Sequence, residues 1–94
     1  MRIEFDPAKD AANIAKHGVS LALGQDILMD PAHLILPTTR VEDGEQRFRA
    51  VGMVGARLWT AVHTYRGVAV RFISVRKSND GEQRFYDRAL RGPQ

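Results

Sequence analysis

The chain has no cysteine among its 94 residues, which excludes disulfide bonds, thiolate nucleophiles and zinc sites built from thiolates. Charged side chains interrupt every apolar stretch, and none approaches the roughly 20 apolar residues that a membrane-spanning helix needs. The first residues, Met1 to Pro7, lack the basic start and apolar run of a signal peptide. We therefore expect a cytoplasmic protein that contacts no membrane.

Histidine is scarce, and the sequence contains no recognisable metal or cofactor motif. His17, His33 and His63 do not have metal-ligand spacing, and no paired acidic cluster accompanies them. Glycine-rich phosphate loops, a Ser-His-Asp order and zinc knuckles are also missing. We therefore expect neither a metal nor a cofactor. His17 is open to two interpretations, a helix-end cap or a general base.

Acidic residues become rare in the second half of the chain. Residues 1–46 contain four Lys or Arg against eight Asp or Glu, whereas residues 47–94 contain ten against three. Nine of those ten are arginines, whose planar guanidinium matches a phosphate in a bidentate way. The asymmetry favours a polyanionic partner for this half, nucleic acid before membrane. A solvated basic face without a ligand is the alternative.

Capping signals and periodicity predict a strand and two helices in the first third of the chain. A short strand is expected over residues 2–5, followed by a helix over 7–17 with Asp6 as N-cap and Gly18 at the left-handed position after its end. A second helix over 20–29 would be capped by Ser20 and end before Pro31. In the first helix an apolar stripe is expected to pack inward, opposite Lys9, Asn13 and Lys16. That stripe consists of Ala8, Ala11, Ile14 and Ala15.

The remaining residues predict a strand meander and a last helix. Strands are expected over 33–37, 47–53, 58–65 and 68–75, with a polar acidic loop over 38–46 and tight turns between the later strands. Ser78 or Asn79 can cap a helix to Leu90, and 91–94 would be a frayed tail. The order β-α-α-β-β-β-β-α predicts one α+β domain over residues 1–94, with helices on a twisted, mostly antiparallel sheet.

Alternation divides the last strand between the two faces of the sheet. One face is expected to carry Val68, Val70, Phe72, Ser74 and Arg76, and the other Ala69, Arg71, Ile73 and Val75. Arg71 would then stand among apolar neighbours, a position that requires a ligand phosphate or an acidic partner. Glu45, Glu82 and Asp87 are the candidate acids.

Four residues are further candidates for a role in phosphate chemistry. Arg76 lies where the last strand gives way to the last helix, so its guanidinium and the helix amides can form an anion site. Arg47 could stabilise a transition state, and the nearby Glu45 could be a base or a surface salt-bridge partner. Tyr86, with a packed ring and a free hydroxyl, is a candidate proton relay near Arg76, or a core residue.

Six segments of the sequence recur together in one known family. They are Phe5-Asp-Pro-Ala-Lys, Asn13-Ile-Ala-Lys-His-Gly-Val-Ser, Asp30-Pro31, Glu45-Gln-Arg-Phe-Arg-Ala-Val-Gly, Val70-Arg-Phe-Ile-Ser-Val-Arg and Glu82-Gln-Arg-Phe-Tyr. In this order, over residues 3–87, the chain resembles the BrnT family of ribonuclease toxins of type II toxin–antitoxin systems. Val75 and Lys77-Ser78 depart from the usual pattern, which reads Ile-Ser-Ala-Arg followed by a basic residue and Ala.

The resemblance implies a RelE-like fold, metal-independent cleavage of RNA, growth arrest and neutralisation by a BrnA antitoxin. Such an antitoxin carries a ribbon-helix-helix domain, through which the complex would bind operator DNA. We expect a catalytic group of Arg47, Arg71, Arg76, Glu82 and Tyr86, and RNA contacts from Arg49, Arg66, Lys77, Lys16 and His17. The general base stays open between Glu45, Glu82 and His17. Two alternatives are an inactive toxin homologue that acts as co-repressor with its antitoxin, and a plain RNA-binding protein.

Overall fold

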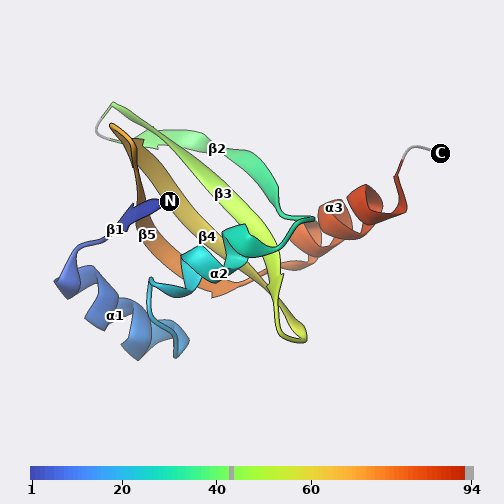
Figure 1. Cartoon of the computed structure of the whole chain (residues 1–94), viewed down its shortest axis with the longest axis horizontal. Coiled ribbons are helices and arrows are strands. Elements are labelled where there is room, and N and C mark those ends of the chain that lie inside the picture. The colour runs from blue at the N-terminus through green and yellow to red at the C-terminus, as the bar shows by residue number, and fades with distance from the viewer. Residues whose placement is uncertain (43, 93–94) are drawn as a thin grey trace.

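The computed structural model describes residues 1–42 and 44–92, and residues 39–42 through their backbone alone. Its elements are β1 (Arg2–Glu4), α1 (Pro7–His17), α2 (Leu23–Met29), β2 (Leu34–Glu42), β3 (Glu45–Val54), β4 (Arg57–Arg66), β5 (Ala69–Lys77) and α3 (Asp80–Arg91). The strands form one sheet in the order β1-β5-β4-β3-β2, in which only β1 and β5 run parallel (Figure 1). The predicted element order and the mostly antiparallel sheet are confirmed.

The main core lies between α2 and the face of the sheet that this helix covers (Figure 1). Its fully buried side chains are Leu21, Ile27, Ala50, Ala61, Phe72 and Val75. The helix approaches closely because Gly24 has no side chain: a Cβ at this position would overlap the ring of Phe72. The burial of these apolar groups holds α2 in place.

A smaller core lies on the opposite face, under the first half of α3. It consists of Val51, Leu58 and Tyr86, and its strand residues alternate with those of the main core. The rest of α3 extends away from the sheet, as Figure 1 shows. Within the described residues, no helix has the length and apolar character that crossing a membrane requires.

The ends of α1 form as predicted, but its buried face is the opposite of the predicted one. Asp6 accepts a hydrogen bond from the N–H of Ala8, and Gly18 adopts a φ of 78°. The apolar stripe is exposed, with Ile14 at 47%, whereas Asn13 is buried. The Asn13 amide donates to the carbonyl of Val75 and accepts from its N–H, so it occupies the free edge of β5.

Two predicted boundaries are wrong. The segment 38–46 is not a loop, because β2 continues to Glu42 and pairs there with Glu45 across a tight turn. Its β-branched residues suit a strand, and an irregularity after Pro37 accommodates the proline. Ser20 does not cap α2, since its hydroxyl donates to Asp10 and the helix begins only at Leu23. Asp43 and the tail residues 93–94 lie outside the described residues.

A bulge in β5 overturns the predicted alternation of this strand. Val62 of β4 pairs with Ser74 while the next residue, His63, pairs with Phe72, so Ile73 has no partner in the ladder. Beyond the bulge the faces exchange, and Val75 joins Phe72 in the main core. Ser74 and Arg76 therefore share the face of Arg71, which α1 and α2 leave uncovered.

The close approach of α2 predicts that Gly24→Ala destabilises the protein by about 1–3 kcal/mol, because the methyl group must displace the buried Phe72 ring. Gly81→Ala in α3 is the matched control. Its Cβ meets nothing closer than the side-chain oxygen of Asn79, at 3.4 Å, so helix propensity should leave stability unchanged or raise it slightly. Urea unfolding of both variants measures the difference. Equal midpoints would contradict this packing.

Candidate functional site

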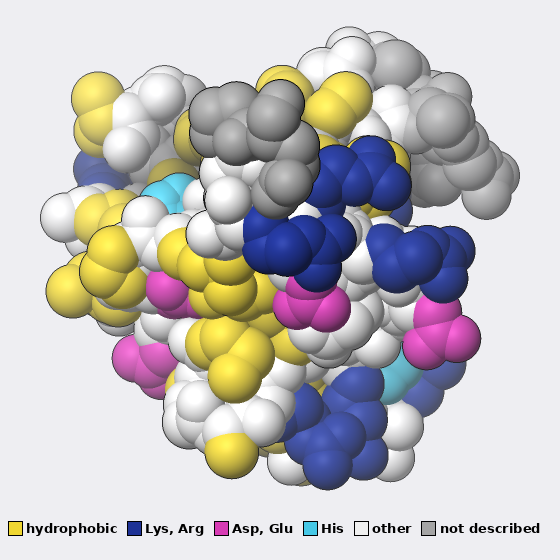
Figure 2. Space-filling model, turned by 90° about the vertical axis from the view of Figure 1, so that its right-hand side faces the viewer, with side chains coloured by type: hydrophobic (Ala, Val, Ile, Leu, Met, Phe, Trp, Pro, Cys, Tyr) yellow, Lys and Arg dark blue, Asp and Glu magenta, His cyan; other side chains and the backbone are white. Residues whose placement is uncertain are grey.

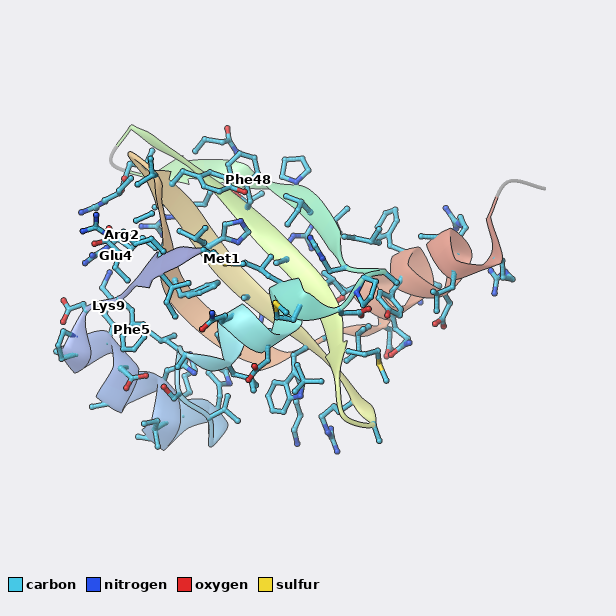
Figure 3. The ribbon with its side chains drawn as sticks, in the orientation of Figure 1. Met1, Arg2, Glu4, Phe5, Lys9 and Phe48 are labelled. Carbon is cyan, nitrogen blue, oxygen red and sulfur yellow. The ribbon has the colours of Figure 1, made fainter. Side chains whose placement is uncertain are left out.

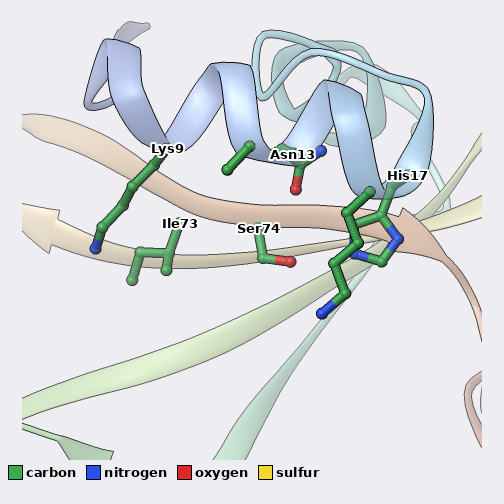
Figure 4. Close-up of a pocket in the computed structure, with 7 residues that line it drawn as sticks. Lys9, Asn13, His17, Ile73 and Ser74 are labelled. Atoms are coloured by element: carbon green, nitrogen blue, oxygen red, sulfur yellow. The ribbon is translucent and has the colours of Figure 1, made fainter.

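The end of α1 and the end of β5 enclose a basic cleft of about 280 Å³. Its lining residues are Lys16, His17, Arg76 and Lys77. All four were predicted as site residues from the sequence, and the structure brings them together although His17 and Arg76 lie 59 positions apart in the chain. None of these lining side chains is acidic, so the cleft attracts anions. Figure 4 shows α1 lying along β5 in this region, with His17 near the end of the helix.

Glu82 anchors the strand side of the cleft. This residue is 1% exposed, and its carboxylate accepts hydrogen bonds from three strands and from the start of α3. Arg76 binds it with both terminal nitrogens, at 2.8 and 2.9 Å. Arg49 Nη1 donates at 3.0 Å, the Thr60 hydroxyl at 2.9 Å and the N–H of Asn79 at 2.9 Å. Such a set of donors stabilises the ionised carboxylate.

The same contacts determine the protonation of this ion pair. Burial alone would raise the pKa of Glu82, but the hydrogen bonds from Arg76, Asn79 and Thr60 outweigh it and lower that pKa from 4.5 to about 2. The hydrogen bonds to Glu82 in turn raise the pKa of Arg76. Glu82 is thus a fully ionised, saturated acceptor at neutral pH. These properties favour a role in positioning Arg76 over the predicted role as proton carrier.

The free hydroxyl predicted for Tyr86 is wrong. Tyr86 donates this hydroxyl to Asp30, and its ring packs in the smaller core, so it is 4% exposed. Burial, followed by the interaction with Asp30, raises the pKa of Tyr86 to about 12. The contact joins α3 to the turn after α2, where Asp30 also accepts from the N–H groups of Ala32 and Met53. These contacts favour a structural role for Tyr86.

The other predicted arginines on the strands lie on the face of the sheet opposite α2, which α3 covers in part. Arg47 and Arg49 lie on β3, two residues apart and therefore on the same face, and Arg71 lies on β5. The acid nearest to Arg71 is Glu4, at 3.9 Å, and not Glu45, Glu82 or Asp87 as predicted. Figure 3 shows Glu4 on β1, at the end of the molecule away from α3.

Arg66 belongs to neither the cleft nor the Glu82 cluster. It bonds Glu45 at 3.3 Å, where β3 begins and β4 ends, so Glu45 lies far along the sheet from His17.

In Figure 2, which looks onto the end that carries α3, Lys and Arg side chains gather mainly on the right-hand half of the surface with acidic side chains among them. The structure thus brings together Arg49, Arg76 and Glu82 on one side of β5 and Lys16, His17 and Lys77 beside them.

The remaining histidines lie away from the cleft. His63 is fully buried, more than the sequence indicated, and packs against Phe48, Tyr65 and Phe72. Burial lowers its pKa. His33 contacts the carbonyl of Asp30. Among the described residues, no three His, Asp or Glu side chains converge on a point where a metal ion could bind.

Sequence reasoning missed three side chains next to the cleft, Lys9, Asn13 and Ile73. Ile73 lies at the bulge of β5, but Lys9 and Asn13 have a signal in the helix spacing, because residues 9, 12, 13, 16 and 17 follow the i, i+3, i+4, i+7, i+8 pattern of one helix face. The signal was overlooked because this face is polar and was expected to point to solvent.

Comparison with known families gives one match over most of the chain. The model described as "Ribonuclease toxin, BrnT, of type II toxin-antitoxin system" matches residues 5–82. The match ends at Glu82, so it includes every residue that lines the cleft. No match was found among curated proteins.

The Glu82 cluster predicts how stability depends on pH. The pKa of Glu82 in the folded protein, about 2, lies below its ordinary value of 4.5, so its contribution is complete above pH 4.5 and is lost as the pH falls toward 2. Glu82→Gln should lower the free energy of unfolding at pH 7 by about 3 kcal/mol. It should also weaken the fall of that free energy as the pH drops from 4.5 toward 2. Chemical unfolding at a series of pH values measures both effects.

Glu45→Gln is the matched control for that substitution. Its partner Arg66 is 51% exposed, so this variant should change stability by less than about 1 kcal/mol. If Glu82→Gln were no more costly than Glu45→Gln, the buried cluster would not stabilise the fold.

Proposed function

Because the chain belongs to the BrnT family of ribonuclease toxins of type II toxin–antitoxin systems, we propose that it is a metal-independent endoribonuclease whose activity arrests growth. Membership implies an RNA target and an antitoxin protein as partner. The observation that carries the proposal is the convergence of Lys16, His17, Arg76 and Lys77 on one cleft. The cleft concentrates positive charge where the charge of a phosphate in RNA would develop during cleavage.

The reaction we propose is an attack by the ribose 2′-oxygen on the adjacent phosphorus. A base removes the 2′-hydroxyl proton, the new O–P bond forms, and the bond from phosphorus to the 5′-oxygen breaks. A proton must then reach that 5′-oxygen, and the products are a 2′,3′-cyclic phosphate and a 5′-hydroxyl. The chemistry therefore needs a base, an acid and cations around the pentacoordinate phosphorus.

His17 is the base that the geometry favours among the three candidates. Glu82 is buried and already accepts five hydrogen bonds, and Glu45 pairs with Arg66 away from the cleft. His17 lines the cleft itself, and imidazole is the side chain whose charge changes near neutral pH. Its protonated form can return the proton to the leaving oxygen.

The cations have different roles because they are held differently. Glu82 fixes the guanidinium of Arg76 through two hydrogen bonds, so Arg76 presents its charge in one orientation. Lys16 and Lys77 have no such anchor among the contacts described and can follow the phosphate as it rearranges. A rigid cation and mobile ammonium groups together can supply the charge that other nucleases take from a metal ion.

The proposal also includes the antitoxin partner and a RelE-like fold, both of which family membership suggests. An antitoxin of BrnA type, with a ribbon-helix-helix domain, would neutralise this toxin in the cytoplasm and would carry the complex to operator DNA. The five-stranded sheet and the element order support a RelE-like relationship. The apolar segment Leu34-Ile35-Leu36 on β2 offers such a partner little surface, since Leu34 and Leu36 pack against the smaller core and Ile35 is 40% exposed.

Expression from a tightly repressed promoter should arrest growth and deplete RNA, and the neighbouring antitoxin gene should restore growth. In the same assay His17→Gln should lose toxicity, since removing a general base costs roughly 10²–10⁴ in rate. Arg57→Gln, at the exposed first residue of β4, is the control and should stay toxic. Normal growth with intact RNA from soluble protein would instead support the inactive co-repressor.

Cleavage of a model RNA by the purified protein should persist in excess EDTA, because Lys16, Arg76 and Lys77 supply the cationic charge. Product analysis should find 2′,3′-cyclic phosphate ends. Loss of cleavage in EDTA that added Mg²⁺ restores would refute the metal-independent mechanism.

A further inference from the structure

The basic cleft continues along α1 into a second hollow of about 180 Å³. Lys9, Ala12, Asn13, Lys16, His17, Ile73 and Ser74 line it. Lys16 and His17 line both spaces, so the two form one groove between α1 and β5. Figure 4 shows this hollow, with Lys9 near one end, His17 near the other and Ser74 on the strand between them.

Two features of the fold create the hollow. One face of α1 lies against β5 because Asn13 bonds both backbone groups of Val75, and this turns Lys9 and Lys16 toward the strand. The two lysines are seven residues apart, which is about 10.5 Å along a helix axis. On the strand side, the bulge at Ile73 places its side chain and that of Ser74 in the lining.

The chemistry of the hollow fits one nucleotide of an extended strand. Lys9 and Lys16 provide a cation at each end, and no side chain in the lining carries a negative charge. Ala12 and Ile73 offer apolar contact to a base or ribose between these cations, and Ser74 offers a hydroxyl. A duplex would present only its outer backbone and leave the apolar contacts unused.

We propose that this hollow is a second nucleotide subsite, which holds the nucleotide adjoining the one at the basic cleft, and that the substrate is single-stranded RNA. The inference rests on the proposed function where it calls the RNA a substrate for cleavage, whereas RNA binding in the hollow does not depend on cleavage. Recognition in this subsite is tolerant of base identity, because the Asn13 amide is already committed to Val19 and Val75. Phosphate contact and apolar packing then provide the affinity.

The test uses a labelled pentanucleotide of 2′-O-methyl RNA, which cannot be cleaved through the ribose, and fluorescence anisotropy at several salt concentrations. Lys9→Ala should weaken binding about fivefold at roughly 0.1 M salt and reduce the slope of log K against log salt by about 0.7, the value of one single-strand phosphate contact. Arg57→Ala removes an exposed positive charge outside the groove and should match the parent. Circular dichroism checks that both variants fold.

Each outcome separates this inference from the proposed function. If Lys9→Ala binds with the affinity and salt slope of the parent, the subsite is refuted, even where the parent cleaves RNA. If Lys9→Ala weakens binding while the parent cleaves nothing, the subsite stands and the ribonuclease proposal fails. If Lys9→Ala leaves RNA binding intact and weakens only the complex with the antitoxin, the hollow belongs to the antitoxin interface and the proposal is overturned.

Discussion

One buried carboxylate, that of Glu82, ties the second half of the structure together. It accepts hydrogen bonds from Arg49 of β3, Thr60 of β4 and Arg76 of β5. It also accepts one from the N–H of Asn79, the N-cap of its own helix α3. Glu82 is 1% exposed, and an unpaired charge at this depth would be too costly for a domain of this size. Arg49 and Arg76 supply the compensating positive charge, and this need for partners on the strands fixes how α3 meets the sheet.

The ion pair between Glu82 and Arg76 also orients a side chain of the candidate site. A buried ion pair is weak evidence of stability in itself, since its desolvation offsets much of the attraction. Its effect here is to hold the guanidinium of Arg76 at the rim of the cleft in one orientation, so that little reorganisation would be needed to bind the phosphate that we propose there. Glu82 thus acts on the site through Arg76 while remaining out of reach of a substrate.

Local signals in the sequence identified the elements, and interactions distant in the sequence decided the details. The helix caps at Asp6 and Asn79 could be predicted from the sequence because each cap bonds a residue at most three positions away. The bulge at Ile73 was not, since it depends on the register with β4. The clustering of Lys16, His17, Arg76 and Lys77 could be suspected from charge and resemblance, whereas the partners of Glu82 and Tyr86 required the fold.

The orientation of α1 links the constraint on the fold to the chemistry of the groove. Since β1 pairs only with Ala69–Arg71, the remainder of β5 is an open edge whose backbone groups need partners. Asn13 meets this need at Val75 with a side-chain amide, whose N–H and C=O groups pair with the backbone of Val75 as those of a neighbouring strand would. A helix that caps an edge in this way must turn its polar face inward, and on this face the neighbours of Asn13 are Lys9, Lys16 and His17. The protection of a strand edge and the basic groove are therefore two results of one packing arrangement.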